Sequence, residues 1–231
     1  MTLYETIFAR RSVRQYDKTP LDEAELSGIK TYLDGVKQLP GQSARFEIVG
    51  SDKLKGGLAP YAILAFADDS DAARVNIGYV LQGVDLYLQS AGYGSVWCGM
   101  AKPQEPQPDY RILLGFGKTS VPLRKGEGEF KRNKITDVSN EDNDVARAAR
   151  LAPSAVNLQP WKLTFTDGKA TVRSSVRGIG RVLPGRLYLF DLGIILKHVE
   201  LALEHIGKQP VEFKLDCSGK DSMVETRYGL G

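Results

Sequence analysis

Two long apolar segments, one in each half of the chain, constrain the fold more than any other feature. The first, Asp71 to Ala91, is apolar on nearly all sides, which predicts a helix in the middle of the core. The second, Asp191 to Gly207, aligns with Asn76 to Gly92 at a constant offset of 115 positions, half of the 231 residues. Buried helices share Leu and Val in any case, but here glycines also coincide, at Gly78 with Gly193 and at Gly92 with Gly207. The alignment therefore favours an internal duplication over coincidence.

Composition and charge limit the classes of function. With 42% hydrophobic and 26% charged residues, the chain is typical of a soluble globular protein. The formal net charge of +3 is small and the charges are interspersed, so we expect no nucleic-acid or membrane partner, although one anionic ligand would fit. No run reaches the ~18 to 20 apolar residues of a membrane span, and the N-terminus reads as a charged amphipathic helix, so we expect a cytoplasmic protein. Cys98 and Cys217 are too few for a disulfide framework, and no Cys/His pair has metal-ligand spacing.

Capping residues and hydrophobic patterns predict further elements around the two apolar segments. The expected helices are Leu3 to Ala9, Leu21 to Gly35 and Asn140 to Leu151. The expected strands are Arg45 to Gly50, Ala62 to Ala67, Ile112 to Gly117, Lys162 to Thr166 and Ala170 to Ser174. Residues 118–134, rich in Gly and charge, are expected to form a surface connection.

A basic motif follows the first helix. In the extended segment after Ala9, residues two apart share a face, so Arg10, Ser12 and Arg14 should point together and Arg11 should point away. Two guanidinium groups and a hydroxyl on one side suit a phosphate dianion. A basic cluster of this kind is more often a solvated face, and both interpretations remain open on this motif alone.

A turn-rich stretch lies between Pro153 and Pro160. Each proline fixes φ and supplies no N–H, so the loop between them should be stiff and should present Ser154, Asn157 and Gln159 in set directions. Such donors and acceptors suit the edge of a planar heterocycle. The alternative is a connection whose polar residues cap a helix end.

Two further segments could contact a ligand. The glycines of Gly92 to Met100 let a backbone approach a ligand closely, or they merely form a tight buried strand. Cys98 within it is predicted to be a small packing residue, because no His lies near it in sequence. The basic stretch Phe130 to Lys134 could reach an anion or could be solvated linker charge.

In order and spacing, these segments resemble the FMN-dependent nitroreductase family, and most closely its members with an internal duplication, over the whole chain. The motifs are Arg-Arg-Ser-x-Arg-x-Tyr after the first helix and Pro-Ser-x-x-Asn-x-Gln-Pro-Trp in the loop. The resemblance implies that FMN phosphate and ribityl groups are held by Arg10, Arg11, Ser12 and Arg14, with Lys131 and Arg132 reaching back to the phosphate. It implies that the isoalloxazine ring lies against Pro153, Ser154, Ala155, Asn157 and Gln159, and that Trp97, Cys98 and Gly99 run beneath it, with a backbone N–H near Cys98 or Gly99 on the reactive N5.

The same resemblance implies an α+β fold, a mixed β-sheet with helices on both faces and two pseudo-repeated halves that share a core. The chain is expected to be a single domain, 1–231, with pseudo-repeats 1–117 and 135–231 joined by the charged linker. The first half has the arginine motif and lacks the Asn and Trp of the loop at Leu39 to Phe46, whereas the second has the loop and no arginine motif. One complete site can therefore be assembled, from both halves of a chain that resembles a fused dimer, so a monomer should suffice.

The function implied is an oxidoreductase that passes hydride from NAD(P)H through flavin N5 to a nitroaromatic, quinone or similar small acceptor. The flavin carries that chemistry, so no catalytic side chain is expected. The alternatives are a non-catalytic module that binds or stores FMN and another flavin-dependent reaction of the superfamily. His198 and His205 lie seven apart in a helix and are expected to be structural or exposed.

Overall fold

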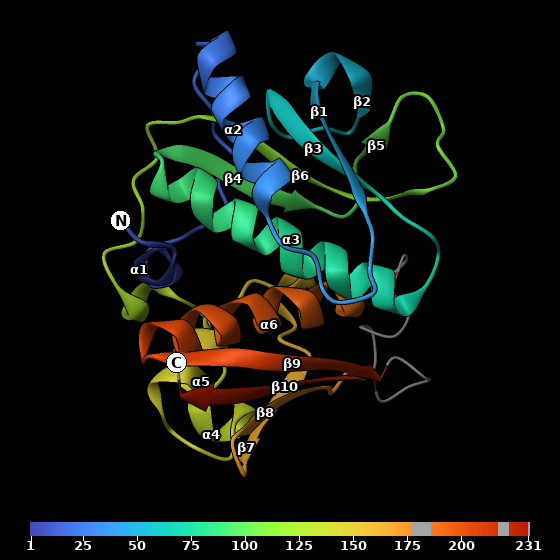
Figure 1. Ribbon diagram of the computed structural model, residues 1–231. Coiled ribbons are helices and arrows are strands. Elements are labelled where there is room, and N and C mark those ends of the chain that lie inside the picture. The colour runs from blue at the N-terminus through green and yellow to red at the C-terminus, as the bar shows by residue number, and fades with distance from the viewer. Residues whose placement is uncertain (177–185, 217–221, 231) are drawn as a thin grey trace.

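The computed structural model describes residues 1–176, 186–216 and 222–230 (Figure 1). Its helices are α1 (Leu3–Ile7), α2 (Glu23–Gly35), α3 (Asp71–Ser90), α4 (Ile135–Val138), α5 (Asp144–Arg150) and α6 (Leu187–His205). Its strands are β1 (Arg45–Gly50), β2 (Leu54–Lys55), β3 (Tyr61–Phe66), β4 (Tyr93–Cys98), β5 (Lys102–Pro103), β6 (Tyr110–Lys118), β7 (Trp161–Thr166), β8 (Lys169–Ser174), β9 (Lys208–Asp216) and β10 (Met223–Leu230). Short 3-10 turns are η1 (Ser51–Lys53), η2 (Glu127–Glu129) and η3 (Ala155–Asn157). Cys217 lies outside the described residues.

The strands form two separate four-stranded sheets, one in each half. The orders are β1-β3-β6-β4 and β7-β8-β10-β9, with β2 and β5 forming a small extra ladder. Every ladder between these strands is antiparallel. Within the described residues, parallel pairing is limited to isolated bridges of Ser12 with Ser95 and of Ser139 with Leu163. The predicted α+β class is confirmed. The expected mixed sheet is instead a pair of antiparallel sheets, in which each strand runs opposite to its neighbours.

The two long helices lie between the sheets. Figure 1 shows α3 in green and α6 in orange, side by side at the centre, with the first sheet on one side and the second on the other. Residues of α2 and α3 pack on one face of the first sheet around Ile63 and Leu114. Residues of α5 and α6 pack on the second sheet around Leu163 and Val172. The helices therefore occupy the middle layer, as their apolar sequences predict.

The backbones of α3 and α6 touch at two glycines. A Cβ atom on Gly78 would lie 2.1 Å from the Phe190 carbonyl oxygen, and one on Gly193 would lie 1.9 Å from the Val75 carbonyl oxygen. Real side-chain atoms do not approach that closely, so both positions require glycine. Gly78 and Gly193 are one of the two glycine pairs that coincide in the sequence alignment, and their role is to let the central helices cross in contact.

Most predicted elements are present within a few residues of their expected ends. The helix expected from Asn140 begins at Asp144, because the Asn143 side chain caps it by accepting the Ala146 N–H at 2.8 Å. Strands β9 and β10 follow Gly207, where φ is 74°, and the sequence reading did not anticipate them. Among the helices in the described part of the chain, none is both long and apolar enough to cross a bilayer.

Candidate functional site

A cavity of about 290 Å³ lies where the two halves of the chain meet. Its wall combines the N-terminal segment, the end of β4, the loop after α5 and the first turns of α6. The lining residues are Ser12, Arg14, Trp97, Gly99, Met100, Ile112, Pro153, Ser154, Ala155, Val156, Leu187, Phe190, Asp191 and Ile194. The volume is at the lower end of the range for small-molecule pockets, and most of the wall is apolar with a few polar groups, as such pockets require.

The N-terminal segment enters the cavity as an added edge of the first sheet. The Val13 N–H donates to the Ser95 carbonyl oxygen at 2.9 Å, next to the bridge between Ser12 and Ser95. The extended backbone turns Ser12 and Arg14 to the cavity, as alternation predicts. Arg11 points elsewhere and donates from Nη1 to the Pro122 carbonyl oxygen at 2.8 Å.

Arg10 is directed inward instead of toward the cavity. It is 1% exposed, and its Nε donates to Asp85 Oδ2 at 2.9 Å. The fully buried Asp85 also accepts bonds from Gln82, Gln89 and Ser95, at 3.2, 3.1 and 2.6 Å. Four donors hold this carboxylate, so the Arg10 guanidinium is fixed in place.

The same buried network reaches the cavity and the second half of the chain. Gln82 Oε1 accepts the indole N–H of Trp97 at 3.3 Å, and Gln82 Nε2 lies 3.2 Å from His198 Nε2. His198 Nδ1 lies 3.1 Å from the Ala148 carbonyl oxygen, and burial lowers the pKa of His198 to about 3. His198 is therefore neutral, donates from Nδ1 and accepts from Gln82, which confirms the structural role predicted for it.

A cluster of arginines stands beside this network. Burial and the repulsion of Arg10, Arg124 and Arg150 lower the pKa of Arg132 to about 10. Buried donors of three of these groups have no acceptor among the described residues: Arg10 Nη2, Arg132 Nε and Arg150 Nε. Unpaired buried donors on mutually repelling cations are what a bound anion would satisfy, so this cluster fits a phosphate group.

The loop after α5 has an unusual backbone. Val156, Asn157 and Gln159 all have positive φ, at 44°, 60° and 51°. Such values are uncommon outside glycine and are strained for β-branched Val156, which is 74% exposed at the cavity. Ser154 Oγ fixes the turn by accepting the Gln159 N–H at 2.9 Å.

The positive φ values turn Asn157 and Gln159 away from the cavity. Asn157 Oδ1 accepts from Arg132 Nη1 at 2.7 Å, and its Nδ2 donates to the Lys131 carbonyl oxygen at 3.1 Å. Gln159 is buried and its Oε1 accepts the Asn133 N–H at 2.8 Å. The prediction that these two amides face a ring is thus not met in this structure, where they bind the loop to residues 131–133. Pro153, Ser154 and Ala155 do line the cavity.

Successive residues at the end of β4 point to opposite faces of the strand. Trp97 and Gly99 line the cavity, whereas Cys98 packs on the other face of the strand with Val96 and Leu113. Burial raises the pKa of the Cys98 thiol. Cys98 is therefore a packing residue, as predicted, although its side chain is not at the cavity. Lys131 has an exposed side chain, and its contact with the loop is made by its carbonyl group.

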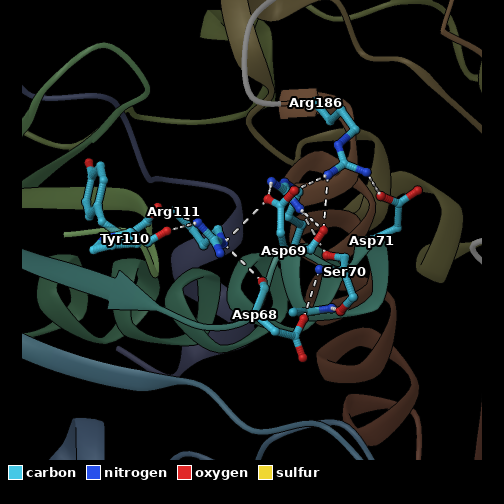
Figure 2. Close-up of polar contacts among 10 residues, drawn as sticks. Asp68, Asp69, Ser70, Asp71, Tyr110, Arg111 and Arg186 are labelled. Carbon is cyan, nitrogen blue, oxygen red and sulfur yellow. Dashed lines mark hydrogen bonds and ion pairs between the residues drawn. The ribbon is translucent and has the colours of Figure 1, made fainter. Parts of the chain in front are cut away.

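An ion-pair cluster fixes the start of α6, whose first turns form one wall of the cavity. Arg186 has φ 51° at the helix cap and donates to Asp71 and to Asp69. Arg74 also donates to Asp69, and Arg111 lies 3.8 Å from the same carboxylate (Figure 2). The hydrogen bond from Arg74 holds the pKa of Asp69 below its ordinary value. The cluster joins α3, β6 and α6, and so holds the α6 wall against the first half.

Asp191 is the one polar side chain among the described cavity residues that the sequence did not point to. It is 3% exposed, and its Oδ1 accepts the Ala155 N–H at 3.0 Å. Burial raises the pKa of Asp191 to about 8. The available signal was its alignment with Asn76, which places a polar residue at the same position of both apolar segments.

Comparisons with known proteins identify relatives along nearly the whole chain. The family model described as "Putative TM nitroreductase" matches residues 2–203. A crystal structure of a putative nitroreductase from Thermotoga maritima has 25% sequence identity and a TM-score of 0.73, covering 98% of this chain and 94% of that one. No curated protein matches the sequence.

Two further solved structures match part of the chain. A nitroreductase family protein from Clostridium difficile has 20% identity and a TM-score of 0.51, covering 62% of this chain and 100% of that one. A putative nitroreductase from Desulfovibrio desulfuricans, solved in complex with FMN, has 18% identity and a TM-score of 0.45, covering 62% and 98%. On the match over residues 2–203, the chain belongs to the family that this model describes as the putative TM nitroreductases.

Proposed function

We propose that this protein is a flavin-dependent oxidoreductase that binds FMN and passes hydride from NADH or NADPH to a small acceptor such as a nitroaromatic or a quinone. The observation that carries the proposal is the inter-half cavity with unpaired, buried guanidinium donors beside it. An apolar slot for a planar ring and an adjacent cationic cluster are the two features that a flavin mononucleotide needs. Family membership supports the same assignment.

The residues fit FMN in two groups. Arg10 Nη2 and Arg132 Nε are the free donors suited to the phosphate, and Ser12 and Arg14 line the cavity itself. Arg11 and Lys131 make their contacts elsewhere and would add only long-range positive charge.

The ring would lie between the loop and the end of β4. Pro153, Ser154 and Ala155 form one wall and Trp97 with Gly99 another. The Ser95 carbonyl oxygen accepts from Val13, so Ser95 faces the edge of β4 that is not paired with β6. Backbone groups alternate along a strand, so the N–H of Trp97 faces the same edge as Ser95. The N–H of Cys98 faces β6. Trp97 and Gly99 are therefore better placed than Cys98 to offer a backbone N–H. Asn157 and Gln159 would act indirectly, by holding the loop against Arg132 and Asn133.

Bound FMN would supply hydride-transfer chemistry, and the protein would supply position, hydrogen bonds and exclusion of water. The Asp85 network keeps Arg10 and Trp97 in fixed positions, and the Asp69 cluster fixes the opposite wall. Preorganised groups of this kind lower the reorganisation needed at the ring.

An anaerobic reduction experiment tests the proposal. Purified protein should bind FMN, and NADH or NADPH added without oxygen should bleach the flavin absorbance in a stopped-flow measurement. If saturating FMN does not bind, the cofactor assignment fails. If FMN binds but neither nucleotide bleaches it, the nicotinamide-dependent reductase is excluded, and a flavin-binding module or another flavin-dependent reaction is left.

A further inference from the structure

The buried carboxyl group of Asp191 faces the cavity without an ionic partner. Among the residues that the structure describes, it forms no ion pair, and its one hydrogen bond is the N–H of Ala155 on Oδ1. The residue is 3% exposed and belongs to the cavity wall. A carboxylate in such a place loses its hydration and gains only one backbone donor, so the charged form is disfavoured.

The corresponding position in the first half is occupied by an amide side chain that also accepts a backbone N–H from a loop. Asn76 is fully buried, and its Oδ1 accepts the Leu39 N–H at 2.9 Å, as Asp191 accepts that of Ala155. The other atom of the amide, Nδ2, donates to Gln38 Oε1 at 2.7 Å. Asn76 and Asp191 thus each use one side-chain oxygen to hold a loop. In Asn76 the second polar atom, Nδ2, is a hydrogen-bond donor.

A protonated carboxyl group divides its atoms in the same way. It has one carbonyl oxygen that accepts and one O–H that donates, whereas a carboxylate only accepts. With the acceptor committed to Ala155, the donor of a neutral Asp191 would face the cavity.

The charged groups around Asp191 do not oppose neutrality. Arg14 reaches the cavity from the N-terminal segment and is exposed to water. Loop residues 153–156 and the end of β4 at 97–100 carry no charged side chain. On the neighbouring helix ends, Arg74 and Arg186 are bound by Asp69 and Asp71. Burial is therefore the main influence on the protonation of Asp191, and it raises the pKa of this group to about 8.

We propose that Asp191 is a specificity-determining hydrogen-bond donor, which selects planar ligands that present a carbonyl oxygen or ring nitrogen to this wall. The identity of the ligand as a flavin rests on the proposed function. Ionisation would replace the donor by a negative acceptor and repel the same ligand. Flavin affinity should therefore be lost as the pH rises through the pKa of Asp191.

Binding titrations across pH test this role. The dissociation constants of riboflavin and FMN are measured by flavin fluorescence from about pH 6 to about pH 9, because the phosphate of FMN itself titrates near pH 6. For wild-type protein, the dissociation constant of either ligand should rise about tenfold per pH unit above the pKa, since only the protonated fraction binds. Asp191→Asn keeps one acceptor and one donor, so it should bind with no such rise. Asp17→Asn, an exposed change of equal charge, should follow the wild type.

A ligand-free measurement separates failure of this inference from failure of the proposed function. The infrared spectrum of wild-type protein near pH 6 should contain the carbonyl stretch of a protonated buried acid, and Asp191→Asn should lack it. If no flavin binds, the flavin assignment fails, and the presence or absence of this band decides the state of Asp191. If flavin binds but the band is absent, or if Asp191→Asn keeps the wild-type pH dependence, the inference fails while the proposed function stands.

Discussion

Arg132 combines three roles in one side chain. It donates to the Leu151 carbonyl oxygen at 3.0 Å and to Asn157 at 2.7 Å, and its Nε is left unpaired. Its pKa is held at about 10 by burial and by neighbouring arginines, so it stays charged at neutral pH. An unsatisfied, repelled cation of this kind gains more from an anion than a solvated surface arginine would.

We expect Arg132→Gln to discriminate between FMN and riboflavin. Loss of a charged hydrogen bond should weaken FMN binding by about 1.5 to 3 kcal/mol. Riboflavin has no phosphate and should lose less, through the loop contact of Arg132 with Asn157 alone. Fluorescence titration of both ligands measures the difference. Arg147→Gln removes an exposed arginine of α5 and serves as the charge-matched control. Equal losses for both ligands would place the phosphate away from this cluster.

Asp191 gives a prediction for stability without any ligand. Its pKa of about 8 in the folded protein is raised from an ordinary value of 3.8, so the folded state binds the proton more tightly than the unfolded chain. The free energy of unfolding should therefore fall as the pH rises from about 4 to about 8, by on the order of a few kcal/mol. Asp191→Asn should remove that loss. Urea unfolding of both proteins at acid and alkaline pH measures this difference in the free energy of unfolding. If Asp191→Asn is no more stable than wild type above pH 8, the folded protein accommodates the carboxylate and the prediction is wrong.

Single residues differ in how far sequence could predict them. Ser12 and Arg14 were placed correctly because an extended backbone leaves only two directions. Asn157 and Gln159 were not, because three left-handed residues reverse the loop, and no local rule anticipates a β-branched Val156 at φ 44°. Arg10 was expected to point to the same side as Ser12 and Arg14, but it turns inward to Asp85, which lies 75 residues away in the sequence.

At the scale of elements, the apolar patterns of α3 and α6 predicted the central layer, and the aligned glycines indicated a special contact. Both follow from local sequence, since a helix without a polar face must be buried. β9 was missed although Val211, Phe213 and Leu215 alternate with charged residues, which is the pattern of a strand. The separation of the strands into two sheets depends on long-range pairing, which periodicity cannot specify.

Replacing Gly193 by Ala should test the helix contact. The added Cβ would meet the Val75 carbonyl oxygen at 1.9 Å, so α3 and α6 must separate. We expect a loss of about 1 to 3 kcal/mol or more in the free energy of unfolding, although alanine favours helices by about 1 kcal/mol. Gly28→Ala in α2 is the matched control, because nothing lies within 4 Å of the added atom, and it should stabilise. Chemical denaturation measures the free energy of unfolding of both variants. If both substitutions raise it equally, α3 and α6 adjust to the added atom without cost and the prediction is wrong.

At the scale of the whole molecule, the cavity belongs to neither half alone. Ser12, Arg14 and Trp97 come from the first half, and Ser154, Ala155 and Asp191 come from the second. We propose that the chain acts as one domain of two pseudo-repeats, 1–117 and 135–231, which together make a single site.

The number of flavins per chain checks this proposal. Saturated protein should hold one FMN per chain, measured from flavin absorbance against protein concentration, and should keep it in a monomer on size-exclusion chromatography. Two FMN per chain would mean that the first half also has a complete site. Loss of FMN on dilution to monomer would mean that a second copy contributes.

The contact at Gly78 and Gly193 has a practical consequence. Two helix backbones that touch without intervening side chains recognise each other by shape, and each surface is made by one half of the chain. For a chain cut within residues 118–134, we therefore expect association of the two fragments to require glycine at both positions of the crossing. Because the cavity forms only when both fragments meet, flavin fluorescence would report their reassembly, and the fold would serve as a split sensor for the proximity of any two proteins fused to its halves.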